Sequence, residues 1–185
     1  MGDLQKTFGP EDVFHYAYAV FHSPGYRVRY AEFLRMDFPR LPLMADVPLF
    51  RKLAAHGADL SALHLLRKDG PDAPNFPTPG TDTVEEIRYI APGEELPVKA
   101  EGEAREGRVH INAHQYFDGV QPEAWAFPIG GYLPAQKWLK DRKGRALSYE
   151  EQAHYPRIIA ALAESRRLMA AIDKDIESAG GWPLK

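Results

Sequence analysis

The first part of the chain spaces its apolar side chains as helices do. Residues 10–21, PEDVFHYAYAVF, set aromatic and aliphatic side chains three to four positions apart, after a proline and two acids that suit a helix N-terminus. Residues 26–36 repeat this spacing between arginines, so we expect a second helix there. The pattern of residues 47–68 predicts two short helices divided by Gly57.

The pattern changes at residues 69–80, DGPDAPNFPTPG, where four prolines and two glycines predict a loop or a boundary between lobes. The segments that follow are short, rich in β-branched and aromatic residues, and separated by Pro/Gly turns. They are TVEEIRYI (83–90), LPVKA (96–100) and RVHINAHQYFDGV (108–120). This pattern is typical of a small antiparallel sheet.

Helical spacing returns in the last third of the chain. Pro134 suits the first turn of a helix over AQKWLKDRK, which Gly144 would end. Ser148 and Glu151 have the S-x-x-E spacing of a capping box and open a helical region that we expect to be interrupted near Pro156. Apolar residues then recur at three, four or seven positions up to residue 176, before the Gly180-Gly181 pair.

This order of elements predicts an α+β fold with an N-terminal helical lobe, a small antiparallel sheet, and C-terminal helices that include one long amphipathic helix. We expect one domain over residues 1–185, with a helical part at about 10–68, a sheet part at about 82–127 and a C-terminal helical part at about 134–178. The aromatic N-terminal helices should pack near the long C-terminal helix, since both carry apolar stripes.

Composition narrows the class of protein. The chain has no cysteine, which excludes disulfides and thiolate metal sites, fits a reducing compartment and predicts a cytoplasmic protein. No apolar run approaches a membrane span, and the N-terminus lacks the pattern of a secretion signal. The net charge of −3 gives no overall attraction to nucleic acid, so the distribution of charge matters more than its sum. Residues 137–145 hold five basic residues and one acid, a local charge of +4.

The catalytic inventory is negative. The sequence has no glycine-rich phosphate loop, no G-x-S-x-G and no thiol, so we expect no catalytic residue. His110 and His114 are four apart, but in strand-like sequence this places them about 13 Å apart, and we expect no metal site. The acid pairs Glu85-Glu86 and Glu94-Glu95 have the pattern of solvated surface.

Three blocks, in order, carry a resemblance to a known family. They are DVFHYAYAVFHSPGYRVRYAEFLRMDFPRLPL, RVHINAHQYFDGV, and IGGYLPAQKWLKDRKGRALS with the downstream YPRIIAALAESRRLMAAID. Together they resemble the C-terminal specificity domain of type ISP restriction–modification enzymes over about residues 11–173. In that family one polypeptide joins a nuclease, a helicase-like ATPase, an adenine N6-methyltransferase and a target-recognition part.

The resemblance implies sequence-specific recognition of double-stranded DNA by a part of the enzyme that is not itself catalytic. The chain lacks the Asn/Asp-Pro-Pro-aromatic motif for a flipped adenine and a glycine-containing loop for S-adenosylmethionine. The chain would therefore hold no cofactor, and S-adenosylmethionine, ATP and Mg would belong to other domains of the parent. Its implied partners are DNA and the methyltransferase domain of the parent polypeptide, and no membrane.

The candidate DNA-binding residues lie in the third block. A helix from Pro134 would align three lysines in one basic stripe, while Trp138 and Leu139 would face the core. The preceding Gly130-Gly131 pair would let the backbone turn sharply. The predicted set is Tyr132, Gln136, Lys137, Lys140, Arg142, Lys143 and Arg145. The alternative is that the glycines form only a turn and the lysines an ordinary solvated face.

Family members read different DNA sequences, so we expect base readers outside the shared blocks, in residues 67–83 or 91–107. Two other classes stay open at this stage. A protein-interaction or scaffold module without DNA contact would explain the aromatic first half and the acidic loops. A stand-alone enzyme has only scattered histidines and carboxylates in its favour.

Overall fold

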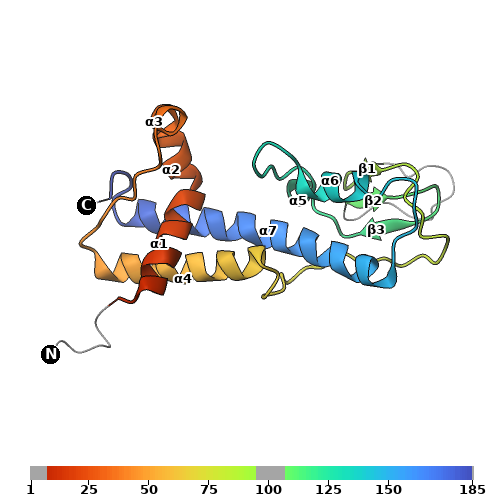
Figure 1. The fold of residues 1–185 in the computed structure, drawn as a ribbon, viewed down its shortest axis with the longest axis horizontal. Helices are drawn as coiled ribbons and strands as arrows, with labels where there is room; N and C mark the ends of the chain where they lie inside the picture. Colours follow the sequence, from red (N-terminus) through yellow and green to blue (C-terminus); the bar gives the residue numbers. More distant parts are fainter. Residues whose placement is uncertain (1–7, 95–106, 185) are drawn as a thin grey trace. The chain divides into compact units, whose positions relative to one another are not determined.

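The computed structural model describes residues 8–94 and 107–184, and within them the chain forms helices and one small sheet (Figure 1). The helices are α1 (Pro10–His22), α2 (Pro24–Arg29), α3 (Ala31–Met36), α4 (Val47–His64), α5 (Pro122–Trp125), α6 (Pro134–Lys140) and α7 (Tyr149–Ser178). The strands are β1 (Arg88–Ile90), β2 (Arg108–His110) and β3 (Tyr116–Asp118). The α+β class, with one long C-terminal helix, is confirmed.

The chain divides into two compact units. Unit 1 comprises Met1–Lys68 and Ser165–Lys185, and unit 2 comprises Asp69–Glu164. The long helix α7 contributes its first part to unit 2 and its last part to unit 1.

Unit 1 is built on the contact between α1 and α4. The prediction that Gly57 divides residues 47–68 into two helices is wrong, because α4 runs through this glycine without a break. Gly57 is buried against α1, and a Cβ atom added to it would lie 1.8 Å from the carbonyl oxygen of His15. The glycine is there for close helix packing rather than as a helix end.

The predicted second helix is also changed in the structure, since residues 26–36 form parts of two short helices that meet at Tyr30. The ring of Tyr30 packs against Tyr26 and Trp182, with centroids 4.9 and 6.0 Å away. The start of α2 is tied to α7 as expected. Asp173 accepts hydrogen bonds from the Ser23 hydroxyl and, at 2.9 Å, from the Gly25 amide.

Unit 2 holds the predicted antiparallel sheet, in the order β1-β2-β3. RVHINAHQYFDGV supplies two strands rather than one, and pairs Val109 with Phe117. LPVKA lies outside the described residues. One face of the sheet packs on α6 and α7 in a core that includes Val109, Phe117, Leu139, Tyr155 and Ile159, all essentially buried.

The expected interruption near Pro156 does not occur, because α7 continues through this proline. A proline inside a helix removes one hydrogen bond and costs about 3 kcal/mol. Here Pro156 and its neighbour Tyr155 are buried, and Ile159 one turn later is 1% exposed. Packing of this face into the unit 2 core offsets the lost hydrogen bond.

Candidate nucleic-acid interface

The segment before α6 makes a tight two-residue turn. Ile129 and Tyr132 exchange two backbone hydrogen bonds of 2.9 and 3.2 Å, and both glycines between them have positive φ, +56° and +87°. Positive φ at both central positions of a two-residue turn strongly favours glycine, so the predicted sharp turn is confirmed. The ring of Tyr132 is left half exposed beside the start of α6.

The basic residues do not all lie on one helix. The helix α6 ends at Lys140, earlier than predicted, and residues 141–144 continue as tight turns up to the Gly144 amide, which donates to the Val84 carbonyl. This backbone bond explains the early end of the helix, because it draws the chain toward residues 82–84. Lys140 and Lys143 are both exposed, while Leu139 is buried as predicted and Trp138 is half-buried in the same core.

Carboxylates neutralise part of the local charge. Lys137 forms an ion pair with Asp141, with 2.7 Å between Nζ and Oδ2. Arg142 stacks on the Trp138 ring at 3.5 Å and binds the Glu151 carboxylate through Nε at 2.8 Å. Arg145 binds the same carboxylate with two nitrogens, at 2.6 and 2.8 Å.

Glu151 also starts α7. Its carboxylate accepts the Ser148 amide at 3.0 Å, and the Ser148 hydroxyl accepts the Glu151 amide at 3.2 Å, which confirms the predicted capping box. Hydrogen bonds from Arg145, then from the Ser148 amide and Arg142, hold the pKa of Glu151 well below its usual range. Glu151 therefore stays charged and keeps both arginines engaged.

Within residues 8–94 and 107–184, two of the predicted cations have no carboxylate partner. Lys140 lies 3.5 Å from the Gln136 side-chain oxygen, and Gln136 itself contacts the Trp125 carbonyl at 3.5 Å. Lys143 has no side-chain partner in the part of the chain that the structure describes. The structure thus separates the five predicted cations into three that are paired with carboxylates, namely Lys137, Arg142 and Arg145, and two lysines that are available to an external anion.

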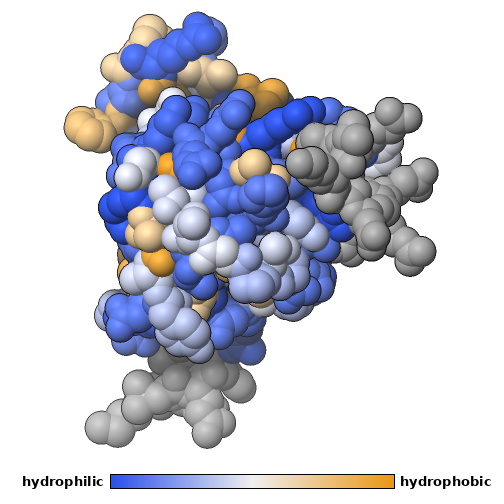
Figure 2. Space-filling view, turned by 90° about the vertical axis from the view of Figure 1, so that its right-hand side faces the viewer, coloured by the Kyte–Doolittle hydropathy of each residue, from blue (hydrophilic) through white to orange (hydrophobic). Residues whose placement is uncertain are grey.

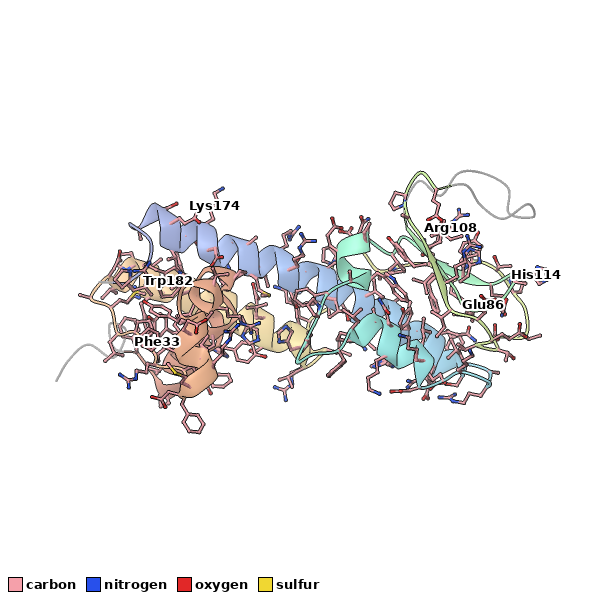
Figure 3. The ribbon with its side chains drawn as sticks, turned by 90° about the horizontal axis from the view of Figure 1, so that it is seen from above. Phe33, Glu86, Arg108, His114, Lys174 and Trp182 are labelled. Atoms are coloured by element: carbon pink, nitrogen blue, oxygen red, sulfur yellow. The ribbon has the colours of Figure 1, made fainter. Side chains whose placement is uncertain are left out.

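A second polar surface lies on the sheet, on the face opposite Val109 and Phe117, and sequence reasoning did not single it out. Arg108 lies on this surface (Figure 3). Its Nε binds Asp118 Oδ1 at 2.6 Å, and its guanidinium lies 4.6 Å from the centre of the Tyr116 ring. Burial, and then the charges of Arg108 and Arg88, lower the pKa of His110. Arg108 Nη1 and His110 Nε2 are buried and have no hydrogen-bond partner among the residues that the structure describes.

The hairpin between β2 and β3 is held by buried amides. The Asn112 side-chain oxygen accepts the amides of His114 and Gln115, and Gln115 in turn binds the Thr78 carbonyl and the Asp82 carboxylate. Gln115 is 1% exposed. These bonds fix the loop at residues 78–83 to the hairpin, whose tip carries the exposed His114 (Figure 3).

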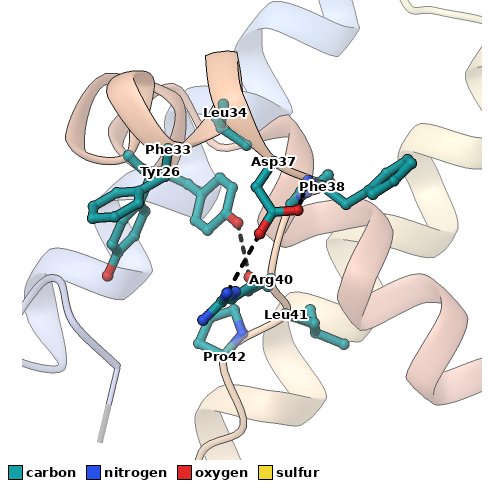
Figure 4. Close-up of a pocket in the computed structure, with 10 residues that line it drawn as sticks. Tyr26, Phe33, Leu34, Asp37, Phe38, Arg40, Leu41 and Pro42 are labelled. Carbon is teal, nitrogen blue, oxygen red and sulfur yellow. Dashed lines mark hydrogen bonds and ion pairs between the residues drawn. The ribbon is translucent and has the colours of Figure 1, made fainter.

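Unit 1 carries an apolar pocket of about 320 Å³ formed by α2, α3 and residues 37–42 (Figure 4). Tyr26 donates to the Arg40 carbonyl at 2.8 Å and Arg40 pairs with Asp37 at 3.4 Å, which holds the pocket wall. Around it Phe33, Met36 and Phe38 are 67%, 77% and 88% exposed. Helix α3 has no buried residue.

The remaining described surface shows no further candidate site. The face in Figure 2 is predominantly hydrophilic. Over residues 8–94 and 107–184, no cluster of three or more His, Asp or Glu side chains is placed to hold a metal ion. No described helix is long and apolar enough to cross a membrane.

Comparison with known proteins identifies the family. Residues 2–171 match the type ISP C-terminal specificity domain, and the chain belongs to this family, as the three sequence blocks indicated. No curated protein matches the chain.

Solved structures share the fold. The cryo-EM structure of the DrdV–DNA complex is 26% identical, with a TM-score of 0.56 over 88% of this chain and 18% of that chain. A nuclease-deletion mutant of the type ISP restriction–modification enzyme LlaGI, in complex with a DNA substrate mimic, is 21% identical, with a TM-score of 0.57 over 96% of this chain and 17% of that one. The ATP-dependent type ISP restriction–modification enzyme LlaBIII bound to DNA is 15% identical, with a TM-score of 0.58 over 97% and 12%. The chain therefore spans less than a fifth of each of these chains.

Proposed function

We propose that this chain recognises a double-stranded DNA sequence as the specificity domain of a type ISP restriction–modification enzyme. The observation that carries the proposal is the family match over residues 2–171, and the 26% identity to a protein solved in complex with DNA supports it. The absence of cysteine fits a reducing compartment, so we propose a cytoplasmic location.

The exposed lysines of unit 2 suit the positioning part of this task. Lys140 and Lys143 carry charges that no carboxylate in the described residues neutralises. Contacts of this kind with phosphates release counterions and are independent of sequence, so they orient a domain on the duplex without reading it. The proposed contact surface also includes Tyr132, Gln136, Lys137, Arg142 and Arg145. The side chains that are already paired with carboxylates should contribute less to DNA affinity.

The remaining activities belong to a parent polypeptide. We infer a site-specific adenine N6 DNA methyltransferase with restriction nuclease and ATP-dependent translocase activity, and S-adenosylmethionine, ATP and Mg would bind to its other domains. The chain alone should neither bind S-adenosylmethionine nor methylate DNA. Methyl transfer by the purified chain to duplex DNA would contradict this.

The apolar surface of unit 1 supports a contact with that parent, in particular with its methyltransferase domain. Phe33, Met36 and Phe38 are far more exposed than side chains of this type usually are, and four arginines between residues 27 and 40 surround them. Relatives carry more than four fifths of their chains beyond the region matched here, which supplies a partner. We expect an apolar partner surface with an acidic rim.

The experiment for the main proposal is fluorescence anisotropy of the purified chain with a pool of random duplexes at two salt concentrations, followed by sequencing of the bound fraction. We expect binding that weakens as salt is raised and enrichment of a defined motif. Binding without any enrichment would reduce the proposal to non-specific DNA binding, and no binding would refute it for the isolated chain.

A further inference from the structure

The proposed function leaves open which side chain reads a base, and the proline-rich loop at residues 69–83 offers a candidate. Asn75 exchanges two backbone hydrogen bonds with Asp118, from Asn75 N to the Asp118 carbonyl at 2.9 Å and back at 2.8 Å. The two residues thereby form an antiparallel bridge that adds one position to the sheet beside β3. Asn75 is part of the sheet in its backbone although its sequence is that of a loop.

The neighbours of Asn75 hold it in place. Pro74 is buried, and the half-buried Phe76 packs its ring against Phe117 of the core with centroids 4.6 Å apart. Asn75 is an exposed residue between these two anchors. A side chain that reads a base needs this combination, because its own backbone must be fixed while its polar end stays accessible.

The sheet register defines the face on which Asn75 lies. Directly opposed residues of an antiparallel pair project to the same face, so Asn75 shares its face with Asp118. Asp118 is in turn opposed to Arg108 in β2. A polar row therefore crosses the sheet through Arg108, Asp118 and Asn75, and its inner members are already paired with each other at 2.6 Å.

The side-chain amide of Asn75 contributes no hydrogen bond to the described fold. In loops, asparagine side chains commonly bond the backbone nearby or permit a positive φ. In the described part of the chain Asn75 does neither, since its amide makes no hydrogen bond and its φ is not positive. Both hydrogen bonds of the bridge come from the backbone, so the fold does not depend on an asparagine side chain at this position.

We propose that Asn75 is a specificity-determining residue that reads an adenine through its side-chain amide. This inference rests on the proposed DNA recognition. The amide presents one acceptor and a donor pair, which match N6 and N7 of adenine in the major groove. The polar row places Asn75 at the open end of a sheet surface, and strands can enter the major groove. Asn75 belongs to the first of the two loops expected to hold base readers, residues 67–83, whereas residues 95–106 of the second lie outside the described residues.

The test compares the motifs that the full chain and its variants enrich from a random duplex pool. Wild type should enrich a motif with at least one fixed adenine. Asn75→Ala should lose the preference at that position and bind the enriched duplex about ten- to a hundredfold more weakly, with unchanged affinity for a scrambled duplex. Asp72→Ala, an exposed truncation in the same loop, is the matched control and should keep the motif.

A second variant protects the test against misfolding. Asn75→Asp has the same shape but cannot donate to adenine N7, so it should lose the adenine preference while its circular dichroism and Tm match wild type. The same motif enriched by both Asn75 variants would overturn the assignment, as would a wild-type motif without a fixed adenine. Absence of any duplex binding by wild type would refute the proposed function for the isolated chain, and this inference with it.

Discussion

The backbone of α1 lies so close to Gly57 of α4 that a Cβ atom on this glycine would be 1.8 Å from the carbonyl oxygen of His15. We expect Gly57→Ala to destabilise the chain by about 3 kcal/mol, because the helices must move apart in a packed core. Helix propensity alone would give the opposite sign, a gain of about 1 kcal/mol. Urea unfolding of the wild type and of Gly57→Ala measures the difference in the free energy of unfolding.

Ala55→Gly is the control for that experiment, since residue 55 is on the exposed side of the same helix. It should cost about 1 kcal/mol through propensity only. If Gly57→Ala proved as stable as wild type, the close approach of α1 and α4 would not exist in solution.

Lys140 and Lys143, which pair with no carboxylate of the described residues, give the second prediction. Replacing Lys140 and Lys143 with Ala should weaken binding about equally across DNA sequences and lower the magnitude of the log K against log salt slope by up to about two. Thermal stability should be nearly unchanged, because both side chains are exposed. Anisotropy over a salt series is the measurement.

Two single variants, Lys137→Ala and Lys174→Ala, are the controls for this experiment. Lys137 is already paired with Asp141, and Lys174 is an exposed lysine of unit 1. Both substitutions should change the slope less than the double variant does. An unaltered slope in the Lys140/Lys143 variant would show an ordinary solvated surface, and the search would move to Arg27, Arg29 and Arg35.

The ion pair on the sheet gives the third prediction. Arg108 has a side chain only 12% exposed, and Asp118, 36% exposed, is its carboxylate partner. Asp118→Ala should destabilise the chain by about 2 kcal/mol, less than for a fully buried pair because water reaches the aspartate. The matched variant is Arg108→Met with Asp118→Ala, which removes both charges. A double variant that is less stable than Asp118→Ala alone would contradict the idea that the unpaired cation causes the loss.

The histidines of unit 1 predict a dependence of stability on pH. Burial lowers the pKa of His22 and of His64, and for His64 the neighbouring His22 adds to the effect, as Arg27 does for His22. Between the folded pKa values and the ordinary value of 6.5 the unfolded chain binds more protons than the folded one. The free energy of unfolding should therefore be highest above pH 6.5 and fall as the pH is lowered through that value.

His64→Gln isolates this contribution. His64 lies between the Tyr18 hydroxyl at 2.7 Å and the Ser165 hydroxyl at 3.0 Å, and glutamine keeps a polar group there without a titrating ring. Urea unfolding at several pH values between 5 and 8 should give a shallower slope for the variant. An identical slope would place the proton uptake elsewhere.

Local signals in the sequence located the ends of several elements. Pro10 with its acids, the Gly130-Gly131 turn and the Ser148–Glu151 capping box each act within a few residues, so the sequence shows them directly. The predictions at Gly57 and Pro156 were wrong for the same reason. Within a few residues of sequence each of them indicates a helix end, but burial against distant residues keeps both inside a helix, and a local pattern does not show that burial.

The sequence predicted the positive charge of the candidate site but not the ion pairs that its side chains form. The basic cluster of residues 137–145 stands out in the sequence, whereas Glu151 engages two of its arginines across a turn. Asn75 was hidden more completely, since its proline-rich surroundings have the pattern of a loop and its bridge to Asp118 spans 43 residues. Such long-range pairing leaves no periodic trace in a single sequence.

In the proposed DNA contact, Glu151 would couple affinity to stability at a single position. Its carboxylate caps the first turn of α7 and holds Arg142 and Arg145, so a neutral residue there would free two cations for DNA and weaken the start of the longest helix at once. A population selected only for tighter DNA binding should lose this acid, and one selected only for heat resistance should keep it. In a protein that needs both properties, residue 151 marks a compromise between them, and gains in affinity should then come from the surrounding loops.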